Sequence, residues 1–254
     1  MLRTAWLAII ALLVTIPAAS GTIAVAAIRS TSPLIDKIIR WWARSLVWAA
    51  GVDLKTSGME KLDRTKRYVL VSNHYSYLDI PCVLASIDQP IRFMAKVSLF
   101  KIPLFGWSIA RAGFIPIDRK NRRTAVKSLD LAADRIRKGN TIVIFPEEGR
   151  SKHREMRPFQ RGAFLLAMKS EQPIVPIAID GTYDVFPPGR WSVKAGPVTV
   201  KIGDEIPTAG LTLKAKDRLL TESRAQIETM LFGAPQTSNE SAQRVANDGQ
   251  VGLE

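Results

Sequence analysis

Residues 68–79 read YVLVSNHYSYLD, and this stretch decides the expected fold. Its first four residues form an apolar run that is closed at once by polar residues, which is typical of a buried strand. A helix is expected to follow from residue 78 to residue 86. A strand that leads directly into a helix is characteristic of α/β proteins, so the polar loop between them lies at the carboxyl end of a strand.

The same alternation continues along the chain. Further strands are predicted at residues 91–94, 114–117, 141–145, 174–179 and 198–202, and further helices at residues 121–138 and 162–170, with Gly139 as a helix stop. Residues 51–232 are therefore expected to form one α/β domain whose mainly parallel or mixed sheet is flanked by helices. Residues 233–254 contain few large apolar side chains, so a disordered tail is expected there.

The first residues of the chain are strongly apolar. No charged residue occurs between positions 4 and 28, and a helix of about 25 residues rising about 1.5 Å per residue crosses a hydrocarbon core of about 30 Å. Pro17 lies in the middle, which leaves open a shallow dip into one leaflet. A cleaved signal peptide is the alternative, because small residues follow Pro17. The apolar run continues to Ile28, which favours a retained anchor.

A second helix is predicted from Pro33, after a possible cap at Ser32. It carries Trp41, Trp42 and Trp48, and tryptophan favours the headgroup level of a bilayer, so we expect an interfacial helix. An amphipathic helix packed on the following domain is the alternative. Residues 1–50 are thus expected to form a membrane-associated segment. Basic residues are denser after the apolar run than before it, which places the body at the cytoplasmic face of the inner membrane.

The overall composition narrows the class of protein. The chain of 254 residues has 36 Lys and Arg against 23 Asp and Glu, a formal charge of +13, and 46% hydrophobic residues. This apolar content excludes a disordered basic protein. The single cysteine, Cys82, excludes a disulfide framework. Most of the positive charge falls in residues 51–232, where it suits an anionic membrane or a phosphorylated substrate. No nucleic-acid partner is expected, since no nucleic-acid-binding motif accompanies the charge.

Two histidines limit the choice of a general base. His153 stands between Lys152 and Arg154 and is expected on the surface. His74 follows the strand at residues 68–71, and Asp79 comes five residues later, so the chain can turn back and bring the carboxylate to the imidazole. A carboxylate on one ring nitrogen leaves the other free to take a proton from a hydroxyl. A structural histidine with a helix-capping aspartate is the alternative. The phosphate-loop, dinucleotide and zinc-helix motifs are absent from the sequence, so no cofactor or metal is expected.

Four sequence blocks together carry a family resemblance. Residues 73–79 (NHYSYLD), 113–119 (GFIPIDR), 145–151 (FPEEGRS) and 175–177 (VPI) occur in this order. They resemble the four blocks of the glycerolipid acyltransferases, the first being the H-x4-D signature. The apolar front and the basic body are similar to the bacterial 1-acyl-sn-glycerol-3-phosphate acyltransferases.

The resemblance implies transfer of an acyl chain from acyl-CoA or acyl carrier protein to the free hydroxyl of a lysophospholipid. His74 would be the general base and Asp79 its orienting partner. Arg119 would hold the acceptor phosphate, for which guanidinium groups are well suited. The remaining block positions are expected at the substrate site: Asn73, Gly113, Glu147, Gly149, Arg150, Ser151 and Pro176. Direct attack by the acceptor needs no covalent acyl-enzyme, metal or redox group.

The third block departs from its family. Glu148 and Gly149 stand where Gly-Thr is usual, and we expect the added carboxylate to point away from the acceptor. Otherwise the acceptor would be another lyso-lipid, with a zwitterionic or amino-acid headgroup. A rival class is a membrane lipid hydrolase that uses His74 with water or with Ser76.

Overall fold

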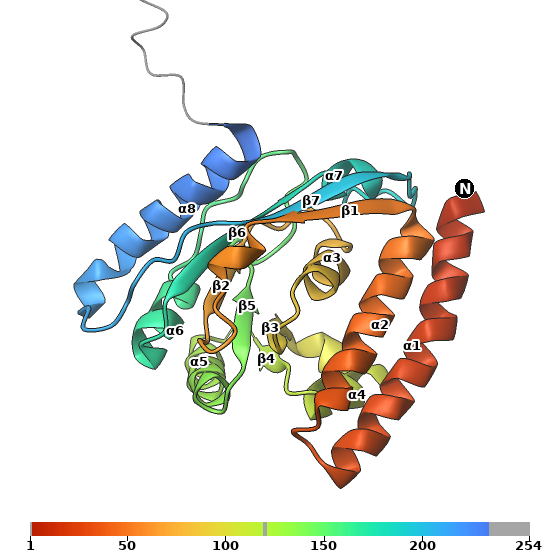
Figure 1. The fold of residues 1–254 in the computed structure, drawn as a ribbon, viewed down its shortest axis with the longest axis horizontal. Coiled ribbons are helices and arrows are strands. Elements are labelled where there is room, and N and C mark those ends of the chain that lie inside the picture. The colour runs from red at the N-terminus through yellow and green to blue at the C-terminus, as the bar shows by residue number, and fades with distance from the viewer. Residues whose placement is uncertain (1, 119–120, 234–254) are drawn as a thin grey trace, which may run out of the picture.

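The predicted α/β architecture is confirmed by the structure, a computed structural model that describes residues 2–118 and 121–233 (Figure 1). Seven strands form one sheet. Their order is β1 (Val52–Ser57), β7 (Gly196–Ile202), β6 (Ile174–Asp180), β2 (Val69–Ser72), β5 (Thr141–Ile144), β3 (Ile91–Lys96) and β4 (Ile115–Ile117). Only β6 and β7 pair in the antiparallel sense, so the sheet is mixed. The tail expected from residue 233 falls, from residue 234 on, outside the described residues.

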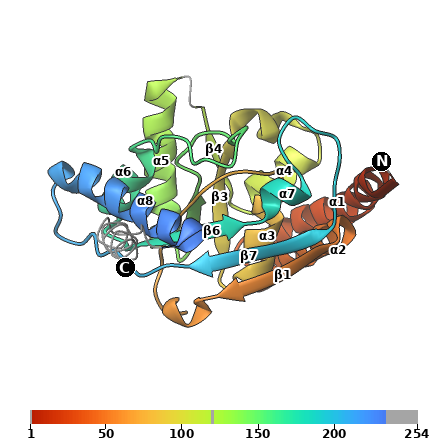
Figure 2. The same ribbon diagram turned by 90° about the horizontal axis from the view of Figure 1, so that it is seen from above.

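Helices cover both faces of the sheet (Figures 1 and 2). One face carries α1 (Leu2–Ile28), α2 (Pro33–Ala50), α3 (Asp79–Ser86) and α4 (Phe105–Arg111), and the other carries α5 (Arg122–Arg137), α6 (Gly162–Ser170) and α8 (Lys216–Phe232). Strand β2 shows why both faces are apolar. Leu70 joins the core under α2 and α3, whereas Val69 and Val71 join the core under α6 and α8, because successive side chains of a strand point to opposite faces.

The six strands and three helices expected from the sequence all occur close to their predicted limits. Elements that were not predicted are β1, α4, α7 (Thr182–Val185), α8 and the 3-10 helices η1 (Met59–Lys61), η2 (Val97–Lys101) and η3 (Leu213–Ala215). Strand β1 lies at the edge of the sheet and buries few of its side chains, so it lacks the apolar run by which the others were recognised.

The first helix runs without interruption through Pro17. By length and composition it is the one described helix that could cross a membrane. Its inner face contributes Leu7 to the main core. Most of its large apolar side chains are exposed on the other face, including Leu2, Trp6, Ile9, Leu12, Leu13 and Ile16.

Helix α2 lies between α1 and α3 and carries the predicted start signal. The Ser32 hydroxyl accepts a hydrogen bond from Leu34 N, and Pro33 occupies the first turn. The indole of Trp42 faces inward and donates to Thr15 Oγ1 at 2.9 Å, whereas Trp41 and Trp48 are exposed. One face of α2 therefore packs on the body, as the alternative expectation had it, and the other presents two indoles outward.

The centre of the sheet determines where chemistry can occur. Strand β2 pairs in parallel with β5 on one side and with β6 on the other. The loops that follow these three strands consequently meet at one edge of the sheet, which is where open α/β sheets bind ligands.

Candidate active site

The loop after β2 brings His74 and Asp79 together. His74 Nδ1 lies 2.7 Å from Asp79 Oδ2, and the imidazole stacks on the ring of Phe145 from the β5 loop, with centroids 4.0 Å apart. Because the carboxylate oxygen is an acceptor, Nδ1 donates to it and Nε2 is left as the basic nitrogen. The imidazole retains 15% of its side-chain exposure, so it can be reached from outside.

Asp79 is fully buried and receives four hydrogen bonds. Besides His74, the backbone N–H groups of Tyr75 and Ser76 donate to Oδ2 at 2.7 and 2.8 Å. Oδ1 accepts from the hydroxyl of Thr182 at 2.6 Å. A buried carboxylate is tolerated only when its lone pairs are satisfied, and here that satisfaction also fixes the carboxylate against the imidazole.

Glu147 ties the β5 loop to the β2 loop. Its Oε1 accepts from His74 N and its Oε2 accepts from Arg157 N, both at 2.8 Å. The side chain is only 2% exposed. Burial raises the pKa of Glu147 to about 7, although the two backbone N–H groups act in the opposite direction. Both oxygens are thus used within the protein, where Glu147 binds the backbone of His74 and Arg157. The expected contact of Glu147 with an acceptor stays a prediction.

Asn73 and Pro176 also have internal roles. The side chain of Asn73 both donates to Ile179 O and accepts from Ile179 N at 2.8 Å, and it is completely buried. Pro176 lies inside β6, opposite Val71 of β2. Both residues thus connect β2 to β6 within the sheet, and the expectation that they bind substrate stays a prediction.

The remaining residues of the third block border His74. Ser151 is buried, and its N–H donates to His74 O at 3.0 Å. The guanidinium of Arg150 lies over the ring of Tyr77, 3.3 Å from the centroid, and is partly exposed. Arg150 is therefore the described cation of this block that is available to a ligand beside the His74–Asp79 pair, which we call the dyad.

The departure at Glu148 and Gly149 has a backbone consequence. Glu148 is exposed and has a φ of +56°, a conformation that glycine adopts without cost and glutamate does not. Glycine at this position, usual in the family, therefore suits the turn. At Gly149 a Cβ would lie 2.7 Å from Arg157 Nη1, so a side chain there requires the guanidinium to move.

The second block is only partly described. Gly113 has a φ of +91° and links α4 to β4, where Ala112 O accepts from the side chain of Arg92. Gly113 thus shapes a turn and has no side chain to offer a ligand. Arg119, expected to hold the acceptor phosphate, lies outside the described residues.

Comparison with known proteins is consistent with this geometry. A family model described as Acyltransferase matches residues 53–180, which is half of the chain. The chain belongs to the acyltransferase family. The predicted resemblance is thereby confirmed, and the matched residues contain every described element of the His74 site up to the end of β6.

Individual relatives share this assignment. The 1-acyl-sn-glycerol-3-phosphate acyltransferase BAT2 of Brassica napus is 40% identical over 125 residues, covering 49% of this chain and 36% of the relative. The putative 1-acyl-sn-glycerol-3-phosphate acyltransferase acl-2 of Caenorhabditis elegans is 32% identical over 198 residues, covering 77% and 69%. The chain spans about a third to a half of the length of the first curated relatives it matches.

A solved structure shows the same fold. The crystal structure of the 1-acyl-sn-glycerophosphate acyltransferase PlsC from Thermotoga maritima matches with a TM-score of 0.74 and 23% identity, covering 100% of this chain and 97% of that one. The shared fold therefore includes the two N-terminal helices.

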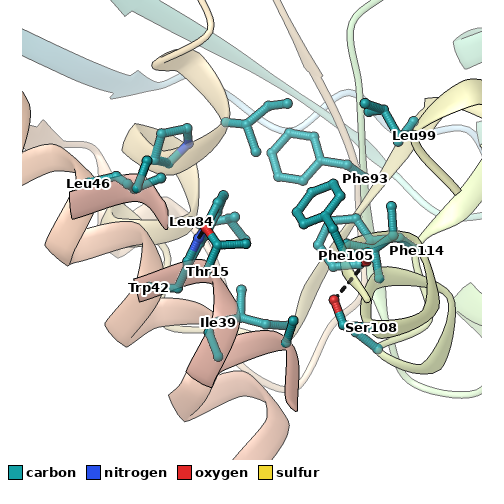
Figure 3. Close-up of a pocket in the computed structure, with 18 of the residues that line it drawn as sticks. Thr15, Ile39, Trp42, Leu46, Leu84, Phe93, Leu99, Phe105, Ser108 and Phe114 are labelled. Carbon is teal, nitrogen blue, oxygen red and sulfur yellow. Dashed lines mark hydrogen bonds between the residues drawn. The ribbon is translucent and has the colours of Figure 1, made fainter. Parts of the chain in front are cut away.

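An apolar cavity of about 250 Å³ reaches the dyad loop of this acyltransferase (Figure 3). Helices α1, α2, α3 and α4 and strand β3 provide its walls, with Thr15, Trp42, Leu84, Phe93 and Ser108 among the lining side chains. Tyr77 and Leu78, between His74 and Asp79, form part of the wall. Three polar side chains of the lining are internally paired: Trp42 donates to Thr15, and Ser108 donates to Phe105 O. The cavity therefore offers an apolar ligand no unsatisfied polar group from these residues.

Two side chains near His74 that could act as nucleophiles, Ser76 and Cys82, are unsuited to covalent chemistry. Ser76 is fully buried, and its hydroxyl donates to Phe186 O at 2.7 Å and accepts from Leu78 N. Cys82 is fully buried, which raises the pKa of its thiol. In the described part of the chain, no group of three or more His, Cys, Asp or Glu residues is placed to hold a metal.

Sequence reasoning missed three contributors to the site: Thr182, Phe145 and Tyr77. Thr182 lies 103 positions from Asp79, the residue it binds. It follows the end of β6 as His74 follows the end of β2, so the rule that directs attention to polar residues after parallel strands could have found it.

Proposed function

We propose that this protein transfers a fatty acyl chain from a thioester donor to the free hydroxyl of 1-acyl-sn-glycerol-3-phosphate, giving phosphatidic acid. The observation that carries the proposal is the His74–Asp79 pair, 2.7 Å apart, beside an apolar cavity. The names of the relatives support the same acceptor.

The reaction follows from the free ring nitrogen. His74 Nε2 takes the proton of the acceptor hydroxyl as its oxygen attacks the thioester carbonyl, and Asp79 stabilises the resulting imidazolium. The tetrahedral intermediate collapses with cleavage of the C–S bond. The imidazolium returns the proton to the departing thiolate, so an ester and a free thiol are formed and His74 is neutral again.

The substrates divide between the cavity and the basic groups. An acyl chain fits an apolar cavity walled by α1 to α4. We assign the acceptor phosphate to Arg150, which is partly exposed beside the dyad, and to Arg119. Acyl-CoA and acyl carrier protein both supply the thioester that the reaction needs, and no cofactor enters it.

The same proposal includes a membrane location. Residues 1–50 would hold the catalytic residues 51–232 on an anionic bilayer, at the cytoplasmic face of the inner membrane. The exposed apolar face of α1 and the two exposed indoles of α2 support this arrangement. Whether α1 spans the bilayer or lies in one leaflet is decided by labelling single cysteines near residue 2 from each side.

The mechanism is tested with purified protein in lipid vesicles and radiolabelled acyl-CoA. His74→Ala should reduce acyl transfer by at least about 10³-fold, as expected for loss of a general base and its positioning. His153→Ala is the matched control and should retain activity, because His153 lies outside the site. Activity of His74→Ala close to that of the wild type would refute the mechanism.

The acceptor is tested separately, since Glu148 adds a carboxylate to the third block. A panel of lysophosphatidic acid, glycerol 3-phosphate and zwitterionic lyso-lipids is expected to show preference for lysophosphatidic acid. Label recovered as free fatty acid with or without acceptor would instead indicate a hydrolase, which the internal pairing of Ser76 disfavours.

A further inference from the structure

Residues 186–195 form a loop that joins the active site to the first turn of α1. At its start, Phe186 O accepts from Ser76 Oγ at 2.7 Å, and the Phe186 ring lies 5.6 Å from that of Tyr77. Near its end, Val193 N donates to Thr4 Oγ1 at 3.0 Å, across 189 positions of sequence. Figure 2 shows this connection from α7 to β7 passing beside α1.

The loop exposes a large aromatic side chain. Trp191 is 85% exposed, more than any other tryptophan of the described residues, and the neighbouring Arg190 is exposed as well. An indole ring has a large apolar area, and burying that area stabilises a protein or a complex. An exposed indole therefore favours contact with an apolar surface.

Two further exposed indoles belong to the adjoining ends of α1 and α2. Trp6 and Trp48 are 45% and 67% exposed, and their rings meet edge to face with centroids 5.9 Å apart. The three segments come together at Gly51, where a Cβ would lie 2.0 Å from Arg3 Nη1 and 3.0 Å from the Cβ of Ala195. We call Trp6, Trp48, Trp191, Arg3 and Arg190 the indole corner.

The chemistry of the indole corner matches the surface of an anionic bilayer. Indoles favour the headgroup level, where the ring is dehydrated and the N–H still finds an acceptor. Guanidinium groups bind lipid phosphates. The corner continues into the exposed apolar face of α1, which no described segment covers.

We propose that residues 186–195 are a membrane-contacting loop, in which Trp191 enters the headgroup layer and Arg190 binds lipid phosphate. The loop would thereby hold the His74–Asp79 pair and the apolar cavity at the bilayer surface. This proposal rests on the proposed membrane-bound function, but it assigns a lipid contact outside the N-terminal helices. Since Phe186 also lines the apolar cavity, the loop connects the lipid surface directly to that cavity.

The first experiment measures insertion and does not depend on acyl transfer. Full-length wild type and Trp191→Phe are bound to vesicles of phosphatidylcholine and phosphatidylglycerol, with and without brominated acyl chains. The difference in fluorescence between the two proteins reports Trp191 alone. We expect this difference signal to shift to the blue on binding and to be quenched by bromine. A difference signal that remains as in buffer would overturn the proposal, even if the protein proves to be an active acyltransferase.

The second experiment compares acceptors in the bilayer and in water. Trp191→Ala is expected to raise the apparent KM for long-chain lysophosphatidic acid in vesicles about ten-fold, from the loss of about 1.4 kcal/mol of indole burial. Its kcat, and its KM for a short-chain soluble acceptor, should be unchanged. Phe232→Ala, which removes an exposed ring from α8 on the other face of the sheet, is the matched control.

Two outcomes of this comparison contradict the proposal. Equal losses with both acceptors would mean that the loop supports the site directly and not through lipid. A smaller oligomer of Trp191→Ala by light scattering, together with an unquenched difference signal, would assign the indole corner to contact with a second copy of the chain.

Discussion

Replacing Glu147 with glutamine should change how stability depends on pH. Burial raises the pKa of Glu147 from 4.5 to about 7 in the folded protein. The folded state therefore binds the proton more tightly than the unfolded state, and its stability falls as pH rises from about 4.5 through about 7. A shift of about 2.5 units corresponds to about 3 kcal/mol. Because this side chain is only 2% exposed, solvent screening reduces the effect little.

Glu147→Gln is uncharged at every pH, and its amide keeps one acceptor oxygen for the two backbone N–H groups. The loss of the other hydrogen bond does not vary with pH. The free energy of unfolding of the variant relative to the wild type should therefore increase by about 3 kcal/mol between pH 4.5 and pH 8. Chemical denaturation followed by circular dichroism in one detergent, at both pH values, measures this difference. Glu155→Gln, on an exposed side chain, provides the control. A stability difference that does not vary with pH would refute the assignment of a buried, titrating Glu147.

Three further substitutions test the loops around the dyad. Thr182→Val removes a donor to the Asp79 carboxylate and should cost about 1.5–3 kcal/mol of stability and lower kcat about ten-fold, whereas Thr182→Ser should retain both; thermal denaturation and steady-state kinetics decide. Glu148→Gly should raise the free energy of unfolding by about 0.5 kcal/mol, because it relieves a positive φ at the expense of a more flexible unfolded chain; an unchanged midpoint of denaturation would count against this. Gly181→Ala places a Cβ 2.3 Å from Pro197 O at a φ of +91°, so a loss of about 3 kcal/mol is expected in the same assay, and a loss below about 1 kcal/mol would show that this turn adapts.

The sequence predicted the central strands better than the edge strand β1 and the last described helix, α8. Central strands such as β5 are buried on both faces and appear as continuous apolar runs. Strand β1 and helix α8 are different. The apolar side chains of β1 are only Val52 and Leu54, and α8 buries only Leu219, Ser223 and Ile227 in 17 residues. So few apolar positions do not identify a strand or a helix in the sequence. These two elements are recognised only from the neighbouring elements against which they pack.

The His74–Asp79 pair could be predicted because five residues separate its members. Glu147 lies 73 positions from His74 and binds its backbone, and a motif cannot show whether a polar side chain faces a ligand or a peptide group. Asn73, which was expected to bind substrate, is a second example, since both ends of its amide bind Ile179. Residue types that suit a substrate are equally suited to holding loops together, and only burial distinguishes the two uses.

Six described polar residues of the first and third blocks differ in their exposure. His74 and Arg150 retain exposure, whereas Asn73, Asp79, Glu147 and Ser151 are at most 4% exposed. Asn73, Glu147 and Ser151 each pair with the backbone of another part of the site. Asp79 binds the side chain of His74. A buried polar group that loses its partner costs about 1–3 kcal/mol, so displacing the β5 or β6 loop would break several such pairs at once. Buried hydrogen bonds from the third block thus hold the loop that carries His74 in one position.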